Sequence, residues 1–143
     1  MRHEIILILD FGSQYTQLIA RRLRELGVKT VIERGDLPAD RLAAIAPIAI
    51  VLSGGPASVF EAGALVPDPA VFSLGVPVLG ICYGMQLMAH LLGGAVSPSE
   101  RREYGLAELE VVASEPLFRG TPARQRVWMS HGDTVTAVPE GFE

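Results

Sequence analysis

Four short apolar runs, separated by helix-like or glycine-rich stretches, constrain the fold of this chain more than any other feature. The runs cover residues 4–10, 28–33, 48–52 and 76–81. The first run is continuously apolar up to Asp10, which is the pattern of a strand buried on both faces of a parallel sheet. Parallel strands need long crossover connections, usually helices, so the runs predict an α/β fold.

The segments between the runs supply the expected helices. Apolar residues recur at helical spacing from Gly12 or Ser13 onward, and Gly27 stands where a C-terminal cap belongs. A short helix is predicted over residues 40–46, and another over residues 85–92. We therefore predict an open, mostly parallel sheet flanked by helices, which is a flavodoxin-like architecture.

The last third of the chain has a different pattern. Residues 106–112, 126–129 and 135–138 are short strand candidates with no long helix between them. They predict a short antiparallel extension attached to the edge of the parallel sheet. Because there is no internal repeat and no low-complexity linker, residues 1–143 are expected to form a single domain.

Charge and cysteine content exclude several classes of function. The net charge is −4, from 12 basic and 16 acidic residues, and no basic stripe crosses the chain, so no nucleic-acid partner is expected. The cluster of Arg21, Arg22 and Arg24 is interpreted as the solvated face of a helix. A single cysteine cannot form an internal disulfide or a thiolate metal cage, which fits a cytoplasmic protein without a metal site.

One long uncharged stretch resembles a membrane span. No Asp, Glu, Lys or Arg occurs between Asp68 and Glu100, which is long enough to cross a bilayer. Prolines and glycines interrupt the stretch, and its pattern changes from strand-like to helical. We therefore expect a buried strand followed by a buried helix and no membrane partner.

The strongest chemical signal is a cysteine between two glycines. The fourth run leads into Gly80-Ile81-Cys82-Tyr83-Gly84, and a helix is predicted directly afterwards. This is the G-x-nucleophile-x-G elbow with cysteine in place of serine, in which larger residues at the glycine positions would collide with neighbouring elements. The helix N-terminus favours a thiolate, and the N–H of Tyr83 can face an oxyanion. A buried, inert cysteine is the simpler alternative, but the elbow favours a nucleophile.

A second signal is Gly54-Gly55-Pro56, directly after the third run. The carboxyl ends of parallel strands share one edge of a sheet, so this loop should lie near Cys82. Two glycines before a proline expose backbone N–H groups, as an oxyanion hole requires. Without the elbow, the same residues would indicate an ordinary turn.

A third signal is Ser130-His131-Gly132-Asp133, which follows a strand candidate. These small or polar residues can present backbone and side-chain groups to a ligand. They are also good turn residues, so a plain turn is the alternative.

Taken together, these motifs resemble the class I, or triad-type, glutamine amidotransferases, and within that family the GMP synthase branch. The resemblance covers essentially the whole chain and is carried by residues 10–22, 52–56, 80–86, 102–105 and 128–133. It implies that Cys82 attacks the side-chain amide of glutamine and that Gly55 and Tyr83 supply the oxyanion-hole N–H groups. It also implies a group that holds the amino-acid end of glutamine: Gln86, Ser130, His131, Gly132 and Asp133.

The resemblance also implies components outside residues 1–143. Ammonia would pass to a GMP synthetase (ATP pyrophosphatase) domain or subunit, which would use ATP and Mg²⁺ to aminate XMP to GMP; no cofactor is expected in the present domain. The family takes its catalytic His and Glu from a later F-H-P-E-like segment, so this chain is expected to be truncated before it and inactive alone. His131 is the candidate local base, whereas His3 and His90 are expected to be structural.

Three alternatives remain open at this stage. Another hydrolase with a cysteine elbow on an α/β sheet would act on an ester or a dicarboxylate. A non-catalytic flavodoxin-like module would bind a phosphate through Gly12-Ser13-Gln14 at a helix N-terminus, and the purified protein would then carry flavin or nucleotide. A degenerate amidotransferase would only dock onto a partner, although the complete elbow argues against loss of activity.

Overall fold

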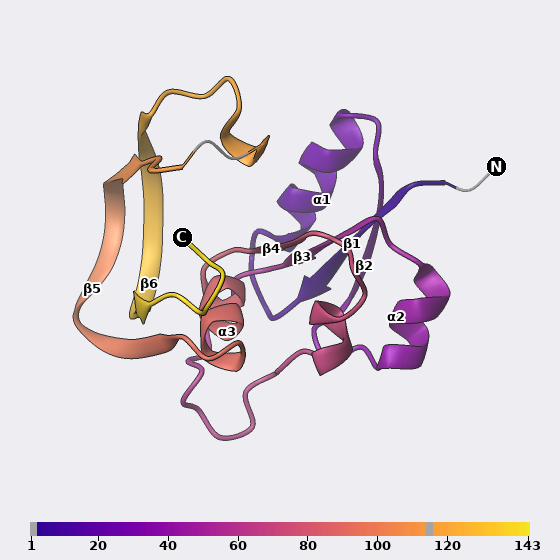
Figure 1. Ribbon diagram of the computed structural model, residues 1–143, viewed down its shortest axis with the longest axis horizontal. Helices are drawn as coiled ribbons and strands as arrows, with labels where there is room; N and C mark the ends of the chain where they lie inside the picture. The colour runs from indigo at the N-terminus through magenta and orange to yellow at the C-terminus, as the bar shows by residue number, and fades with distance from the viewer. Residues whose placement is uncertain (1–2, 114–115) are drawn as a thin grey trace.

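A four-stranded parallel sheet forms the centre of the molecule (Figure 1). The computed structural model describes residues 3–113 and 116–143, without the side chains of residues 99–104 and 130–131. The strand order is β2–β1–β3–β4, and every neighbouring pair is parallel. The strands are β1 (Ile5–Asp10), β2 (Lys29–Arg34), β3 (Ala49–Leu52) and β4 (Val78–Gly80). The helices that follow them are α1 (Thr16–Glu25), α2 (Ala39–Ile45), the 3₁₀ helix η1 (Pro69–Phe72) and α3 (Tyr83–Leu91).

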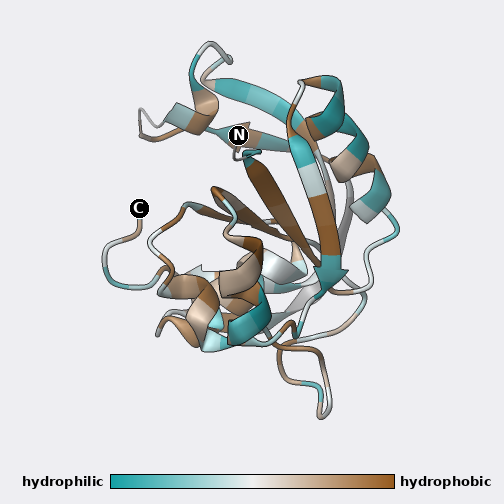
Figure 2. Ribbon diagram, turned by 90° about the vertical axis from the view of Figure 1, so that its right-hand side faces the viewer, coloured by the Kyte–Doolittle hydropathy of each residue, from teal (hydrophilic) through white to brown (hydrophobic). Residues whose placement is uncertain are grey.

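Apolar side chains leave the sheet on both faces, as the first run predicts. On β1, Leu7 and Leu9 enter a core with side chains of α2 and α3, whereas Ile8 packs with Ala20 of α1 on the opposite face. Figure 2 shows the strands of this sheet as hydrophobic ribbons between the helices. The α/β prediction is therefore confirmed, with helices covering both faces of the sheet.

Two helix starts differ from the sequence prediction. Helix α1 begins at Thr16 and not at Gly12 or Ser13, because side chains bond to the backbone before it. Asp10 Oδ1 accepts a hydrogen bond from the Gly12 N–H at 2.9 Å, and Ser13 Oγ accepts one from the Tyr15 N–H at 3.0 Å. Helix α3 begins at Tyr83, before the predicted residue 85, so Cys82 is its N-cap.

The antiparallel part is confirmed, but its arrangement differs from the prediction. Strands β5 (Ala95–Glu110) and β6 (Arg124–Ala137) form a separate two-stranded sheet that lies beside α3 and does not extend the parallel sheet (Figure 1). The strand candidates at residues 126–129 and 135–138 are parts of one strand. Residues 130–133 therefore continue β6 and do not form a turn, because pairing of residues 130, 131 and 133 with β5 outweighs their turn propensity, with a register irregularity at Gly132.

The uncharged stretch after Asp68 folds into several short elements. It contains η1, β4, α3 and the start of β5. Among the helices of the described residues, none has both the length and the apolar character needed to cross a membrane.

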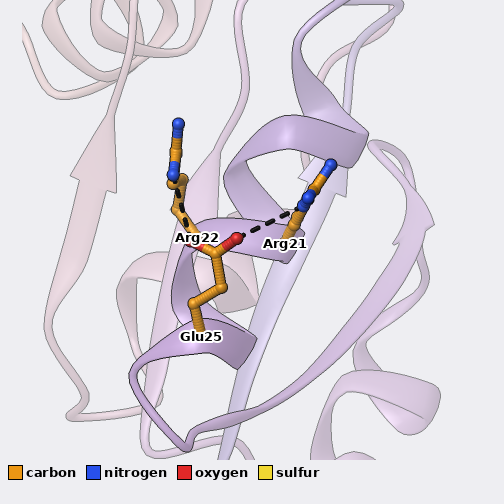
Figure 3. A network of polar contacts seen from close by, with 3 residues as sticks. All are labelled: Arg21, Arg22 and Glu25. Atoms are coloured by element: carbon orange, nitrogen blue, oxygen red, sulfur yellow. Dashed lines mark hydrogen bonds and ion pairs between the residues drawn. The ribbon is translucent and has the colours of Figure 1, made fainter.

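The arginine cluster lies on the exposed side of α1, as expected (Figure 3). Arg21 Nε lies 3.3 Å and Arg22 Nη1 lies 3.0 Å from the two carboxylate oxygens of Glu25. Arg24 instead reaches the carbonyl oxygen of Thr30 at 3.4 Å. Exposed pairs of this kind contribute little to stability, so the cluster is a solvated helix face.

Candidate active site

Cys82 occupies a strained turn between β4 and α3. Its backbone has φ of 50° and ψ of −113°, a conformation that non-glycine residues rarely adopt. Strain of this kind persists only where the surrounding structure imposes it, and it is concentrated at functional sites. The elbow predicted from Gly80 to Gly84 is therefore present in the backbone.

The two glycines of the elbow are required by close packing. A Cβ atom on Gly84 would lie 2.3 Å from the carbonyl oxygen of Leu52, and one on Gly80 would lie 2.7 Å from Cα of Met85. Both contacts involve backbone atoms, which cannot move aside cheaply. Any other residue at these positions would push α3 away from β3 and β4.

A cavity of about 350 Å³ opens beside the sulfur at the carboxyl edge of the sheet. Its walls come from the loops after β1 and β3, which are adjacent strands whose chain connections diverge to opposite sides. Ligands of open α/β sheets bind at such a switch point. The lining residues are Gly12, Ser13, Gln14, Tyr15, Gly54, Gly55, Pro56 and Cys82.

The Gly54–Gly55 loop faces the nucleophile, as predicted. A Cβ atom on Gly54 would lie 3.3 Å from Cβ of Cys82, and one on Gly55 would lie 2.2 Å from the carbonyl oxygen of Phe11. The buried hydroxyl of Ser53 anchors the start of the loop by accepting the Phe11 N–H at 3.0 Å and donating to Gly54 O at 2.8 Å. Glycines are therefore needed here for close approach to Cys82 and to the β1 loop.

The side chains of Gln86 and Asp133 are bonded to neighbouring segments beside α3. The Gln86 side chain is only 3% exposed, and its Nε2 donates to the main-chain oxygen of Asp133 at 3.0 Å. The Asp133 carboxylate accepts a hydrogen bond from Ser58 Oγ at 2.6 Å. Gly132 is in β6 beside them, and the side chains of Ser130 and His131 lie outside the described residues.

The backbone and the side chain of Tyr83 have different roles in the site. Its ring is 2% exposed, packs edge-on against Phe11, and donates from its hydroxyl to Leu65 O at 2.7 Å. Its N–H belongs to the first turn of α3, where backbone donors lack intrahelical acceptors. The backbone of Tyr83 is thus available for an oxyanion, while the side chain is part of the core.

Neither histidine whose side chain is described lies close to Cys82. His90 is eight residues farther along α3, about 12 Å along the helix axis, and its ring packs edge-on against Phe60. His3 lines a surface hollow with Glu4 and Lys29 at the amino edge of the sheet, opposite the nucleophile. Both histidines are exposed, and neither lies within reach of the Cys82 sulfur. The described residues also contain no group of three His, Cys, Asp or Glu side chains positioned for a metal ion.

Burial raises the pKa of the Cys82 thiol above its ordinary value. The N-terminus of α3 acts in the opposite direction, but such an effect is worth about 0.3–1 kcal/mol, less than one pKa unit. Burial and the helix N-terminus therefore act on the Cys82 thiolate in opposite directions. A base that accepts the thiol proton is still needed.

This pKa direction predicts the pH dependence of alkylation in the 143-residue chain. We expect the rate of Cys82 modification by iodoacetamide to rise with pH and to reach its midpoint above that of free cysteine, because the thiolate is the reacting form. Intact-mass measurement over a pH series tests this. A midpoint below that of free cysteine would show that the helix N-terminus outweighs burial.

The comparison with protein families decides the identity of this site. The family profile described as glutamine amidotransferase class-I matches residues 7–143. This chain belongs to that family. The match includes the elbow, the Gly54–Gly55 loop and the β5–β6 sheet.

Individual relatives of this class I glutamine amidotransferase are similar over nearly its whole length. A GMP synthase [glutamine-hydrolyzing] of Enterococcus faecalis is 55% identical over 140 residues, which cover 98% of this chain and 27% of the relative. The enzyme of the same name from Solidesulfovibrio magneticus is 59% identical, and the match covers 96% of this chain and 27% of that enzyme. The chain thus spans about a quarter of the length of these relatives.

Solved structures agree with this family membership. A candidate GMP synthase subunit from Thermoplasma acidophilum superimposes with a TM-score of 0.79 and is 30% identical, covering 98% of this chain and 70% of that one. A glutamine amidotransferase from Thermotoga maritima has a TM-score of 0.72 at 24% identity. The match covers 98% of this chain and 65% of that one and supports the fold.

Sequence reasoning missed several residues that build the site. Asp10 holds the β1 loop through Gly12 and also accepts from Thr16 Oγ1 at 3.0 Å, while Ser53 and Ser58 hold the first part of the β3 loop. The position of Asp10 at the end of a buried strand was a usable signal. Ser58 carried none, because its partner lies 75 residues away.

Proposed function

We propose that this chain is the glutamine-hydrolysing domain of a GMP synthase. The observation that carries the proposal is the strained Cys82 elbow, which opens into a cavity with the Gly54–Gly55 loop on the opposite side. The identities of 55% and 59% to enzymes named GMP synthase [glutamine-hydrolyzing] support this branch of the family.

In this proposal Cys82 is the nucleophile. Its thiolate attacks the side-chain amide carbon of glutamine, and the oxygen becomes an oxyanion that accepts hydrogen bonds from the N–H groups of Gly55 and Tyr83. The C–N bond then breaks, and the nitrogen takes a proton and leaves as ammonia. Water hydrolyses the resulting thioester to glutamate and restores the thiol.

The cavity wall beside Cys82 also includes the loop after β1. This loop contains Gly12, Ser13 and Gln14, which the flavodoxin-like alternative would assign to a phosphate. Because it faces the nucleophile across one shared cavity, we assign it to the glutamine pocket. In the same proposal Ser130, His131 and Gly132 belong to the side of the pocket formed by β6, with Gln86 and Asp133 beneath it.

The remaining parts of the reaction are proposed to lie outside residues 1–143. The base for Cys82 and its acidic partner are assigned there, because neither His3 nor His90 lies within reach of the sulfur and the family resemblance implies that His131 binds the amino-acid end of glutamine. The synthetase part would use ATP and Mg²⁺ to activate XMP for attack by ammonia. A cytoplasmic location accords with the single, free cysteine.

Labelling with a chloroketone analogue of glutamine tests the proposal. We expect the full-length protein to acquire one adduct, on Cys82, which excess glutamine prevents and excess glutamate prevents less well. Intact mass and peptide mapping measure this outcome. Modification of Cys82 by iodoacetamide without any modification by the analogue would show that the cavity does not accept glutamine.

A further inference from the structure

Asp133 connects three segments that are distant in sequence. Its carboxylate Oδ2 accepts a hydrogen bond from Ser58 Oγ at 2.6 Å, across 75 residues. Its main-chain oxygen accepts from Gln86 Nε2 at 3.0 Å, across 47 residues. One residue of β6 therefore binds both the loop after β3, which carries Gly54 and Gly55, and helix α3, which begins directly after Cys82.

Both partners of Asp133 are themselves held in place. The Gln86 side chain is 3% exposed and lies within the first turns of α3. Ser58 Oγ also accepts the Phe60 N–H at 3.3 Å, and the Ser58 N–H donates to Glu61 Oε1 at 3.1 Å, so Ser58 sits in a local turn. The hydroxyl is thus oriented with its proton toward the carboxylate, and hydrogen bonds to an ionised acceptor are stronger than neutral ones.

Two sets of hydrogen bonds hold the first part of the loop after β3. Near its start, Ser53 bonds to Phe11 and Gly54, and Gly55 packs against the Phe11 backbone. Farther along, the bond from Ser58 to Asp133 ties the loop to β6. Without this hydrogen bond, the segment from Pro56 to Ser58 would no longer be attached to β6 and, through Gln86, to α3. The distance between the N–H groups of Gly55 and Tyr83 would then vary.

We propose that Asp133 and Ser58 are positioning residues that hold the two oxyanion-hole donors at a fixed separation, with Gln86 securing Asp133 to α3. The inference rests on the proposed glutamine hydrolysis. It assigns Asp133 and Gln86 a role different from direct contact with the amino-acid end of glutamine, because Asp133 Oδ2 already accepts from Ser58 and Gln86 Nε2 already donates to the main-chain oxygen of Asp133.

Steady-state kinetics of the full-length protein test the inference. Ser58→Ala is expected to lower kcat for glutamine hydrolysis about tenfold, the equivalent of one charge-assisted hydrogen bond, while the KM for glutamine changes little. An oxyanion hole acts mainly in the transition state, so kcat is the parameter that falls. Ser58→Thr, which keeps the hydroxyl, is expected to restore most of kcat.

Matched variants distinguish a positioning role from direct substrate binding and from loss of folding. Ser73→Ala removes an exposed serine hydroxyl at the end of η1 and serves as the control for folding and handling. Asp133→Ala and the double variant with Ser58→Ala are expected to lose about as much kcat as Ser58→Ala alone, because both remove the same bond. Thermal melting identifies losses that arise from unfolding.

Three results would overturn the inference. The first is a wild-type kcat in Ser58→Ala. The second is a raised KM with unchanged kcat in Asp133→Ala, which would show direct substrate binding. The third is a loss of kcat in Ser58→Ala that Ser58→Thr does not restore and that is accompanied by a lowered melting temperature of the variant. Failure of the proposed function would be distinct, since the wild-type protein would then release no glutamate from glutamine.

Discussion

Replacement of Cys82 by alanine is expected to abolish glutamine hydrolysis by the full-length protein, with kcat lowered by at least about 10⁴-fold. The reaction needs a covalent thioester, and no other cysteine exists in residues 1–143 to form it. Glutamate release from glutamine, followed by a coupled dehydrogenase assay, measures the effect. A variant that retains a tenth of the wild-type rate would overturn the assignment of Cys82 as nucleophile.

Supplying ammonia directly provides the control for this variant. In the proposed function the synthetase part uses ammonia and not glutamine, so Cys82→Ala is expected to form GMP from XMP, ATP and an ammonium salt at the wild-type rate. Loss of both activities would indicate that the substitution damages folding or domain contact, and the nucleophile test would then be repeated with Cys82→Ser.

Gly84→Ala is expected to destabilise the fold, although a glycine-to-alanine change inside a helix usually stabilises by about 1 kcal/mol. The added Cβ would lie 2.3 Å from Leu52 O and 2.7 Å from Leu52 Cβ. Both atoms belong to a buried strand, so α3 would have to move away from β3. We expect a loss of about 3 kcal/mol in the free energy of unfolding, measured by urea denaturation.

Gly132→Ala is the matched control for this substitution. Among the described atoms, no heavy atom lies within 4 Å of the position that its Cβ would occupy, and its φ is not in the left-handed region. The free energy of unfolding should therefore change by no more than about 0.5 kcal/mol. A gain in stability in Gly84→Ala would contradict the close packing of α3 on β3 that defines the elbow.

The parallel part of the fold could be predicted from the sequence because its signals are local. Strands β1, β3 and β4 are short apolar runs, β2 has an apolar centre and α1 shows helical periodicity, so the order of these elements follows from short stretches of chain. The ends of elements were less predictable. The start of α1 depends on hydrogen bonds from Asp10 and Ser13 to the backbone, which apolar periodicity does not register.

The β5–β6 sheet was predicted less well because its structure depends on pairing between distant residues. Residues 130–133 have strong turn propensity but lie inside β6, where Asp133 pairs with Pro98 and Ser130 with Tyr104. Local propensity alone divides this strand in two. Tertiary pairing joins the two parts into one strand, since every residue in the ladder must satisfy its backbone groups.

By itself, the sequence determined the fold class, the order of strands and helices, and the place of Cys82 between two glycines at a strand–helix junction. These are consequences of hydrophobic periodicity and of backbone freedom at single residues. Only the tertiary structure decided that the β1 loop shares a cavity with Cys82, and that Asp133 bonds to Ser58 and Gln86. The two hydrogen bonds join residues 47 and 75 positions apart, and no local pattern encodes which polar groups meet when the chain closes on itself.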